Sequence, residues 1–410
     1  MFNSSSMFQG RKDKRKGKTC QLFRATDFVS LMYPCFWFCR ILGIFPYKIN
    51  ASTIKTCKSR HILSIIIICI FCTLELKIFY DINISKDVAF KSATPRIIER
   101  NFFYIIGGFT VVTAFILSGP RIRFLQTILE LSLKLPLKSY ENLSRLIHTK
   151  DILGFFFVIV DLPMYSIIIQ VDYLRLLLLL YIFLLEFIMD MLYMNCVCIL
   201  KACFKQINDN LMNLRELVTN GKPYVLSDTC HEDRNPFLLM EIIALKKQHL
   251  AISDAVQMLK MVFSLQILST TVMTFTQVTF NLYFYLMQIK ADASMSNQER
   301  QFYYLYFITI AIYYLIKIVL IVWACETGKT QAVEIRSTVH DVFNSTSNKQ
   351  IKYEMQLFSL QLSHCENTFS AKGLNVDATL LTKIIGGITT YILILIQLLF
   401  MSSSCGGKSV

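Results

Sequence analysis

The residues best suited to chemistry lie in the last apolar stretch, "GGITTYILILIQLLF" at 386–400. Lys383, Gly387, Thr390, Ile394 and Gln397 follow one another at alternating steps of four and three, which places them on one face of a helix. The amide of Gln397 could hydrogen-bond to a neighbouring helix, a contact worth about 0.6–2 kcal/mol in a bilayer. Alternatively, this polar stripe could line a water-filled pore. The spacing alone favours the helix contact and leaves the pore open.

Ionisable side chains also occur inside other apolar stretches, where charge is costly and usually faces the interior of a helix bundle. They are Glu75, Lys77, Asp161, Glu186, Asp190 and Lys317. Glu186 and Asp190 are one helical turn apart, so they could share a metal ion or a proton. Because no third ligand is evident, the sequence favours a structural hydrogen-bond or ion-pair partner. We expect no catalytic role, no metal and no cofactor.

The thirteen cysteines do not indicate a disulfide framework. Disulfides need paired cysteines in an oxidising space, and only Cys405 falls on the side predicted to be extracellular. The CxxC pair Cys69 and Cys72 lies within an apolar stretch and lacks a second pair at zinc-site spacing. The six histidines are scattered and form no catalytic motif. The sequence therefore gives no sign of an enzyme.

The elements that carry these residues are helices, because the composition is that of a membrane protein. Of 410 residues, 54% are hydrophobic and 17% are charged, with a mean hydropathy of +0.47. A transmembrane helix needs about 20 apolar residues, and backbone groups in lipid must be satisfied within the segment. We therefore predict an all-α protein with seven transmembrane helices, near 61–81, 99–118, 152–171, 173–200, 261–288, 302–325 and 380–401.

The basic residues set the expected orientation of these helices. Twelve of them precede the first transmembrane helix, including the run RKDKRKGK, and six more follow the second helix between residues 121 and 150. Basic residues concentrate on the cytoplasmic side, so we expect the N-terminus in the cytoplasm and the C-terminus outside. The basic tail suits anionic inner-leaflet lipid, and we expect no nucleic-acid partner. Asn83-Ile84-Ser85 is then the one glycosylation sequon on the outer side.

Six segments follow from this topology: a cytoplasmic basic tail with an interfacial helix at 1–60; transmembrane helices 1–6 at 61–325; a cytoplasmic helical hairpin at 201–260 within them; a cytoplasmic loop and amphipathic helix at 326–379; the last helix at 380–401; and an extracellular tail at 402–410. Cytoplasmic extensions of helices 4 to 7 would form an anchor region. The connection at 119–150 is expected to be a cytoplasmic loop. A three- and four-residue period predicts the amphipathic helix through Met355, Phe358, Leu362, Cys365 and Phe369. A short extended turn at Gly373 would separate it from the last helix.

The pair Thr390-Tyr391, followed by five aliphatic residues and Gln397, resembles the Thr-Tyr-(five hydrophobic)-Gln-Phe signature in the final helix of insect gustatory receptors. The segments "MYPCFWFCRILGIFPYKI" and "FSLQLSHCENTFSAKGLNVDATLL" resemble other parts of that family. Leu398 stands where the family usually has Phe, which leaves the packing of the gate open.

This resemblance implies a ligand-gated, non-selective cation channel, a homo- or hetero-tetramer with other gustatory receptors in the plasma membrane. Four copies of the last helix would line one pore, with Gln397 and Leu398 near the gate. The implied pore residues are Lys383, Thr390, Tyr391, Ile394, Gln397 and Leu398. A small tastant, a sugar or a bitter compound, would bind in the outer halves of helices two to six. The candidates there are Phe103, Tyr104, Tyr165, Gln277, Tyr283, Tyr304 and Phe307, although aromatic residues at helix ends can also form an interfacial belt.

Two other functions stay open on the sequence. An odorant receptor of the same superfamily would share the topology but generally lacks the Thr-Tyr-Gln signature. A G-protein-coupled receptor would place its N-terminus outside, contrary to the basic residues, and neither its Asp/Glu-Arg-Tyr nor its Asn-Pro-x-x-Tyr element ends the third or seventh helix. A membrane enzyme or transporter would need clustered ionisable groups or broken helices, and neither is evident.

Overall fold

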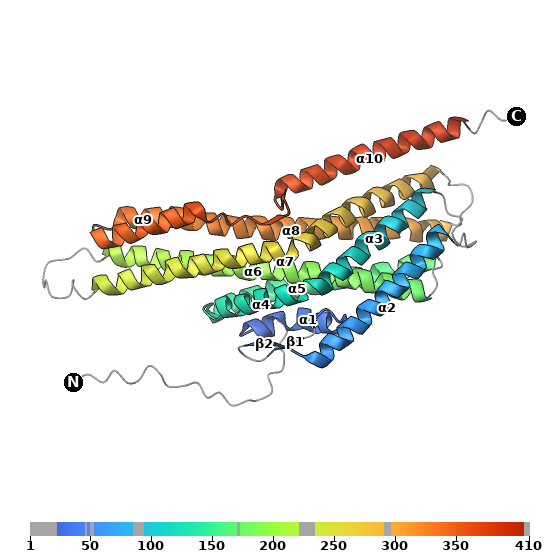
Figure 1. Ribbon diagram of the computed structural model, residues 1–410. Coiled ribbons are helices and arrows are strands. Elements are labelled where there is room, and N and C mark those ends of the chain that lie inside the picture. The colour runs from blue at the N-terminus through green and yellow to red at the C-terminus, as the bar shows by residue number, and fades with distance from the viewer. Residues whose placement is uncertain are drawn as a thin grey trace.

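The computed structural model describes residues 23–45, 47–49, 53–84, 94–169, 173–220, 234–290 and 297–405. Nearly all of this part of the chain is helical, and the long helices lie side by side in an elongated bundle (Figure 1). The helices are α1 (Phe28–Ile41), α2 (Lys58–Asn83), α3 (Thr94–Ile116), α4 (Ser118–Ser132), α5 (Leu137–Ile169), α6 (Tyr173–Asn220), α7 (Arg234–Lys290), α8 (Asn297–Ser345), α9 (Lys349–His364) and α10 (Ala378–Cys405).

Three helices form the centre of the bundle and are much longer than a membrane is thick. The helices α6, α7 and α8 contain 48, 57 and 49 residues. At 1.5 Å per residue they are roughly 70–85 Å long, against about 30 Å for the hydrocarbon core of a bilayer. They continue together to the end of the bundle at which α9 lies (Figure 1). In α6 every side chain from 185 to 200 is buried, which explains why apolar residues occur on every side of this stretch.

Six of the described helices are long and apolar enough to cross a membrane, and they coincide with six of the predicted windows. These are α2, α3, α6, α7, α8 and α10. The window predicted at 152–171 falls mainly in α5, which runs to Ile169. The side chains from 161 to 169 and residues 170–172 lie outside the described part.

The segment 119–150 is helical, so the expectation of a loop there is wrong. It contains most of α4 and the first part of α5. Phe124, Leu125, Ile128 and Leu129 recur at helical spacing on α4 and are buried, because α4 packs against α6 and α7. Similarly, α8 continues through 326–345 where a loop is expected. In both places a charged, amphipathic helix lacks the long apolar run that identifies a transmembrane helix.

The first helix, α1, packs on α5 and α6. Asp27 caps it, because its carboxylate accepts a 2.8 Å hydrogen bond from the Ser30 N–H. Pro34 lies within the helix, and Phe28, Leu31 and Phe36 are among its buried residues. An unpredicted antiparallel hairpin follows, in which β1 (Tyr47–Ile49) pairs with β2 (Ile54–Thr56). The basic run RKDKRKGK lies outside the described residues.

A second short hairpin joins α9 to α10. Met355, Phe358 and Leu362 are buried on α9, as the helical period predicts. The helix ends at His364 with Cys365 as its cap, so the prediction that it continues through Cys365 and Phe369 is wrong, and Phe369 is buried beyond its end. Strands β3 (Ser370–Ala371) and β4 (Leu374–Asn375) then pair in antiparallel register. Lys372 and Gly373 both have positive φ, at 45° and 86°. This is the tight turn that a two-residue hairpin requires, so the connection is a hairpin and not only an extended turn.

Candidate functional site

The last helix, α10, contacts the bundle along only one side. Leu380, Ile384 and Ile388 are buried against α7 and α8. Figure 1 shows the rest of α10 diverging from the bundle toward the end opposite α9. Large apolar side chains are consequently exposed on it, with Leu393 at 55% and Ile394 at 45% of full exposure. Most of the surface of this helix is therefore available to something outside the chain.

The polar stripe predicted on α10 lies outside the buried face. Lys383, Thr390, Ile394 and Gln397 are exposed, and Gly387 is half-buried. The Thr390 hydroxyl donates to the Gly386 carbonyl of its own helix at 2.9 Å. Within the described part of the chain, Gln397 has no hydrogen-bond partner, so the favoured contact with a neighbouring helix is not made inside one chain. The side chain of Leu398 lies outside the described residues.

A close contact fixes α10 against α7. A Cβ atom added at Gly387 would lie 2.9 Å from Cε2 of Phe275, so the glycine lets the two helices approach. Tyr391 packs edge-on against the same phenylalanine ring, with centroids 5.5 Å apart. At Gly386, by contrast, an added Cβ would meet nothing within 4 Å. The two neighbouring glycines therefore lie on different faces, one toward α7 and one away from it.

The predicted ligand residues are mostly buried inside the bundle. Phe103, Tyr104, Gln277, Tyr283 and Phe307 are each at most 7% exposed. Aromatic residues of an interfacial belt would face the lipid boundary, so the belt does not describe these four aromatic residues. Tyr304 is half-buried and packs against Tyr285 at 5.3 Å. The side chain of Tyr165 lies outside the described residues.

Polar contacts join three of the helices that carry these candidates, and sequence reasoning missed several of the residues involved. Gln277 on α7 donates a long hydrogen bond of 3.4 Å to Glu99 on α3. Arg96, one turn before Glu99, donates to the Tyr303 hydroxyl on α8 at 3.2 Å. Tyr303 in turn packs against Phe307 at 4.6 Å. Arg96 and Glu99 lie just before the apolar stretch of α3. Two opposite charges at that position were the sequence signal that could have identified them.

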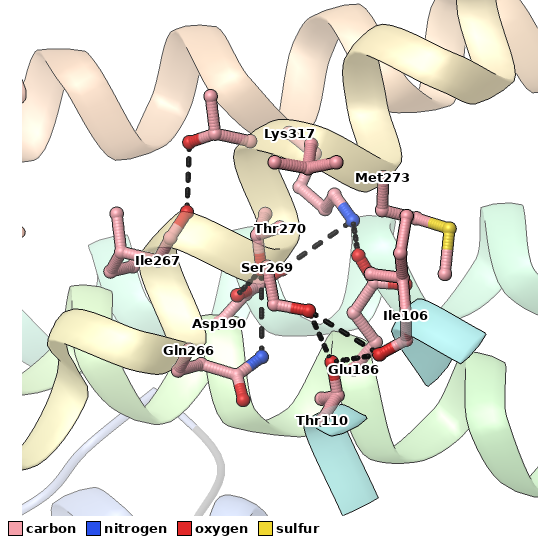
Figure 2. Close-up of polar contacts among 12 residues, drawn as sticks. Ile106, Thr110, Glu186, Asp190, Gln266, Ile267, Ser269, Thr270, Met273 and Lys317 are labelled. Carbon is pink, nitrogen blue, oxygen red and sulfur yellow. Dashed lines mark hydrogen bonds and ion pairs between the residues drawn. The ribbon is translucent and has the colours of Figure 1, made fainter. Parts of the chain in front are cut away.

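A second polar centre lies deeper in the bundle and is drawn in Figure 2. The Nζ atom of Lys317 on α8 lies 2.7 Å from Glu186 Oε1 and 3.4 Å from Asp190 Oδ2, both on α6. These three side chains are at most 3% exposed. The predicted ion-pair partner of the two carboxylates is thus confirmed, and it is Lys317.

Hydrogen bonds extend this buried centre to two more helices. Thr270 on α7 donates to Asp190 Oδ1 at 2.7 Å, and Gln266 contacts Thr270 at 3.5 Å. Ser269 on α7 shares a hydrogen bond with Thr110 on α3 at 2.5 Å. The centre therefore ties α3, α6, α7 and α8 together. The described residues contain no group of three His, Cys, Asp or Glu that could hold a metal ion.

The remaining predicted residues lie apart from these two centres. Glu75 on α2 lies against Gly108 of α3, and Lys77 is exposed. The side chain of Asp161 lies outside the described residues. Asn83 is exposed at the end of α2, and its amide exchanges hydrogen bonds of 3.0 and 2.9 Å with Asn101. A glycan at Asn83 would be attached to the same amide nitrogen that donates to Asn101.

Part of this chain is similar in sequence to known proteins. Two Drosophila melanogaster proteins, named "Putative gustatory receptor 28b" and "Putative gustatory receptor 28a", are 32% and 29% identical to this chain over 161 and 153 residues. These regions span 38% and 37% of this chain and only 33% and 34% of the relatives.

The fold resembles that of a solved receptor over almost its whole length. The insect olfactory receptor OR5 from Machilis hrabei in complex with eugenol matches 90% of this chain and 97% of its own, with a TM-score of 0.66. The sequence identity is 12%, so this likeness concerns the fold. The sequence model of the family described as "7tm Chemosensory receptor" matches residues 32–401. This chain therefore belongs to the 7tm chemosensory receptor family.

Proposed function

We propose that this chain is a gustatory receptor of the plasma membrane, a tastant-gated, non-selective cation channel built as a homo- or hetero-tetramer. The family consists of chemosensory receptors and not of enzymes. The observation that carries the proposal is the exposure of the polar stripe on α10, namely Lys383, Thr390, Ile394 and Gln397. A polar face in a membrane needs water or polar partners. Four copies around one axis would provide a water-filled path for it.

In this proposal the chain is oriented with its N-terminus in the cytoplasm, as its basic residues predict. The end of the bundle that carries Arg96, Glu99 and Tyr303 then faces outward. Buried aromatic rings beside polar side chains suit a small tastant such as a sugar or a bitter compound. The olfactory receptor in complex with eugenol provides a precedent for a small ligand on this fold. Binding among these residues would alter how α3, α7 and α8 pack.

Coupling to the pore would pass through α7. This helix carries Gln277, which contacts Glu99 of α3, and also Phe275, which contacts Gly387 and Tyr391 of α10. Gln277 and Phe275 are only two residues apart. A small rotation of α7 would therefore move both contacts together and shift α10 relative to the pore axis.

The test compares two neighbouring threonines on α10. Thr389 and Thr390 are both exposed, and each donates a 2.9 Å hydrogen bond to its own helix. Only Thr390 lies on the polar stripe. We expect Thr390→Ala and Gln397→Ala to change ligand-evoked current or resting leak, and Thr389→Ala to change neither. The measurement is patch recording across a tastant panel in cells that lack other receptors, with surface labelling to check expression. Unaltered permeation and gating in both stripe variants would reject the pore role of this face.

An odorant receptor of the same superfamily is the second candidate, because the fold match is to an olfactory receptor. A panel that includes volatile compounds alongside sugars and bitter compounds separates the two. A G-protein-coupled receptor is distinguished by topology. An N-terminal tag that stains on unpermeabilised cells would contradict the channel.

A further inference from the structure

A long hollow runs between α5, α6 and α8 and is not used by the proposed channel mechanism. Its volume is about 570 Å³, within the roughly 300–1,000 Å³ of small-molecule sites. Its walls include Leu153 and Phe157 of α5, Phe187 of α6, and Ile316 and Leu320 of α8. All five of these side chains are apolar. We call this hollow the apolar slot.

The apolar slot opens on the side of the bundle, between its helices. Leu153 and Ile316 on its rim are 57% and 43% exposed, whereas Phe187 at its back is buried. These residues lie in or next to segments predicted to cross the membrane, so the opening faces the hydrocarbon of the bilayer. Its α8 wall, from Tyr313 to Leu320, is about 10 Å long at 1.5 Å per residue. That length matches much of one leaflet, which is about 15 Å of hydrocarbon.

One end of the slot is basic. Arg145 and Lys150 of α5 line it there, before the predicted transmembrane stretch begins at 152. Lys150 is buried and paired with Asp151 at 2.5 Å. Arg145 is exposed and forms no ion pair with the residues that the structure describes. The guanidinium of Arg145 is therefore available to an anion at this end of the slot.

A second hollow continues from this end, and the two share Leu146. Its volume is about 390 Å³, and it is lined by both polar and apolar residues of the segment 136–146 and of α6. Lys138, Lys201 and Lys205 face it together with a single carboxylate, that of Asp209. With Arg145, this makes four cations against one anion beside the mouth of an apolar slot. We call this second hollow the basic groove.

We propose that the apolar slot and the basic groove together bind one anionic phospholipid of the cytoplasmic leaflet. One acyl chain lies in the slot between α5 and α8, and the phosphorylated headgroup lies against Arg145 and the lysines of the groove. Four cations suit a headgroup that carries several phosphates, such as a phosphorylated inositol. The assignment to the cytoplasmic leaflet rests on the orientation proposed above. The lipid contact itself is independent of channel activity.

This position would let the lipid act on the buried ion pair. Lys317 lines the apolar slot while its Nζ atom holds Glu186 at 2.7 Å. An acyl chain in the slot packs on the lysine stem beside the ion pair. Because the headgroup would hold that chain in place, the lipid is expected to stabilise the packing of α6 against α8.

The test uses the purified full chain in phosphatidylcholine nanodiscs with a trace of photoactivatable phosphatidylinositol bisphosphate. A photoactivatable phosphatidylcholine of the same chain length is the reference probe. Mass spectrometry locates the cross-linked peptides. We expect the anionic probe to label α5 and α8 at the slot more strongly than the reference probe. Each surface cation contributes about fivefold in affinity for anionic lipid, so Arg145→Gln and Lys205→Gln are each expected to weaken labelling about fivefold. Lys349→Gln, an exposed lysine outside both hollows, should leave it unchanged.

A matched pair on α8 tests the apolar slot separately. Ile316 and Leu315 are both exposed, at 43% and 38%, and only Ile316 lines the slot. Ile316→Trp is expected to abolish labelling at the slot, and Leu315→Trp to retain it. Equal labelling by both probes, or labelling that survives Ile316→Trp, would overturn the proposal. Because this readout needs no current, it stays informative even if the chain fails as a tastant-gated channel.

Discussion

Lys317 is the only ammonium group within contact distance of Glu186 and Asp190 in the described part of the chain. Its Nζ atom also lies 4.8 Å from the centre of the Tyr314 ring, which favours a cation there. Burying one charge without a partner is far more costly than burying a complete pair. The lysine is therefore needed to keep two carboxylates inside the bundle.

Replacement of this lysine should destabilise the protein strongly. We expect Lys317→Met to lower the free energy of unfolding by about 3–5 kcal/mol, because it leaves the two buried carboxylates without a cation. Lys77→Met is the matched control, since Lys77 also lies in a predicted transmembrane helix but is exposed. Thermal unfolding of both variants in nanodiscs provides the measurement. Equal loss in the two variants would contradict a specific role for the buried pair.

A double variant separates the ion pair from packing at the same place. Glu186→Gln together with Lys317→Met removes one charge of each sign and should recover part of the loss, because the two residues are in direct contact. Full additivity of the two single losses would show that the charges are not coupled.

At the scale of single residues, the sequence predicted which buried side chains are charged better than it predicted which residues they contact. The apolar surroundings of Glu186, Asp190 and Lys317 were visible in the sequence, and so was the expectation of an ion pair. The choice of Lys317 depends on how α6 and α8 are rotated and shifted against each other, which no spacing within either helix encodes. The contacts of Arg96 with Tyr303 and of Glu99 with Gln277 escaped for the same reason.

Among the helices, α9 and the hairpin after it are held on α7 around His249. This histidine is fully buried and packs between Phe204 of α6 and Phe358 of α9. Amide nitrogens of Gln361 and Asn367 lie 3.1 and 3.4 Å from its two ring nitrogens. A protonated ring would turn both of its nitrogens into donors. A neutral ring can accept a hydrogen bond from one of these amides, whereas a protonated ring can accept from neither, so the site favours the neutral imidazole.

The stability of this junction should depend on pH. Burial lowers the pKa of His249 from its usual 6.5 to about 4. The unfolded chain therefore binds a proton at His249 below pH 6.5, whereas the folded chain does so only below about pH 4. The neutral ring therefore contributes about 3 kcal/mol to the free energy of unfolding above pH 6.5. This contribution is lost as the pH falls from 6.5 toward 4.

Unfolding measured between pH 7 and pH 4 tests this dependence. His249→Gln should remove the part of the pH dependence that arises in this window, even if the variant is less stable throughout. His364→Gln, at an exposed histidine at the end of α9, should preserve it. An unchanged pH profile in His249→Gln would show that acid acts elsewhere.

The long apolar helices and the amphipathic α9 could be predicted because both give a strong local signal. Length identifies the former, and Met355, Phe358 and Leu362 recur at helical spacing in the latter. The helix α4 was missed because its apolar stripe is embedded in charged sequence. The β3–β4 hairpin has only two residues in each strand, too few for an alternating pattern, and Gly373 was its only visible sign.

At the scale of the whole molecule, α10 and α2 are the two apolar helices that a single chain leaves most exposed. The last helix, α10, touches α7 and α8 along one side and exposes Ile385, Tyr391 and Leu393. Lipid could cover these three side chains, but it could not satisfy Lys383, Thr390 and Gln397 on the adjacent face. The periodicity of the sequence predicted this stripe, yet whether it faces the bundle or away from it is decided only by packing against α7 and α8.

Cross-linking between copies tests whether α10 meets itself in an assembly. Ile394→Cys and Gln397→Cys place thiols on the stripe, in a background where Cys69 and Cys405 are serine. Around a four-fold axis these thiols lie close together, so a short bifunctional maleimide should join two, three and four chains of 47.5 kDa each. Leu76→Cys on α2 is the control, because Leu76 is 69% exposed and lies on a different helix, so it should remain monomeric. Linkage that stops at two chains, or is equal at Leu76, would contradict a central four-fold pore lined by α10.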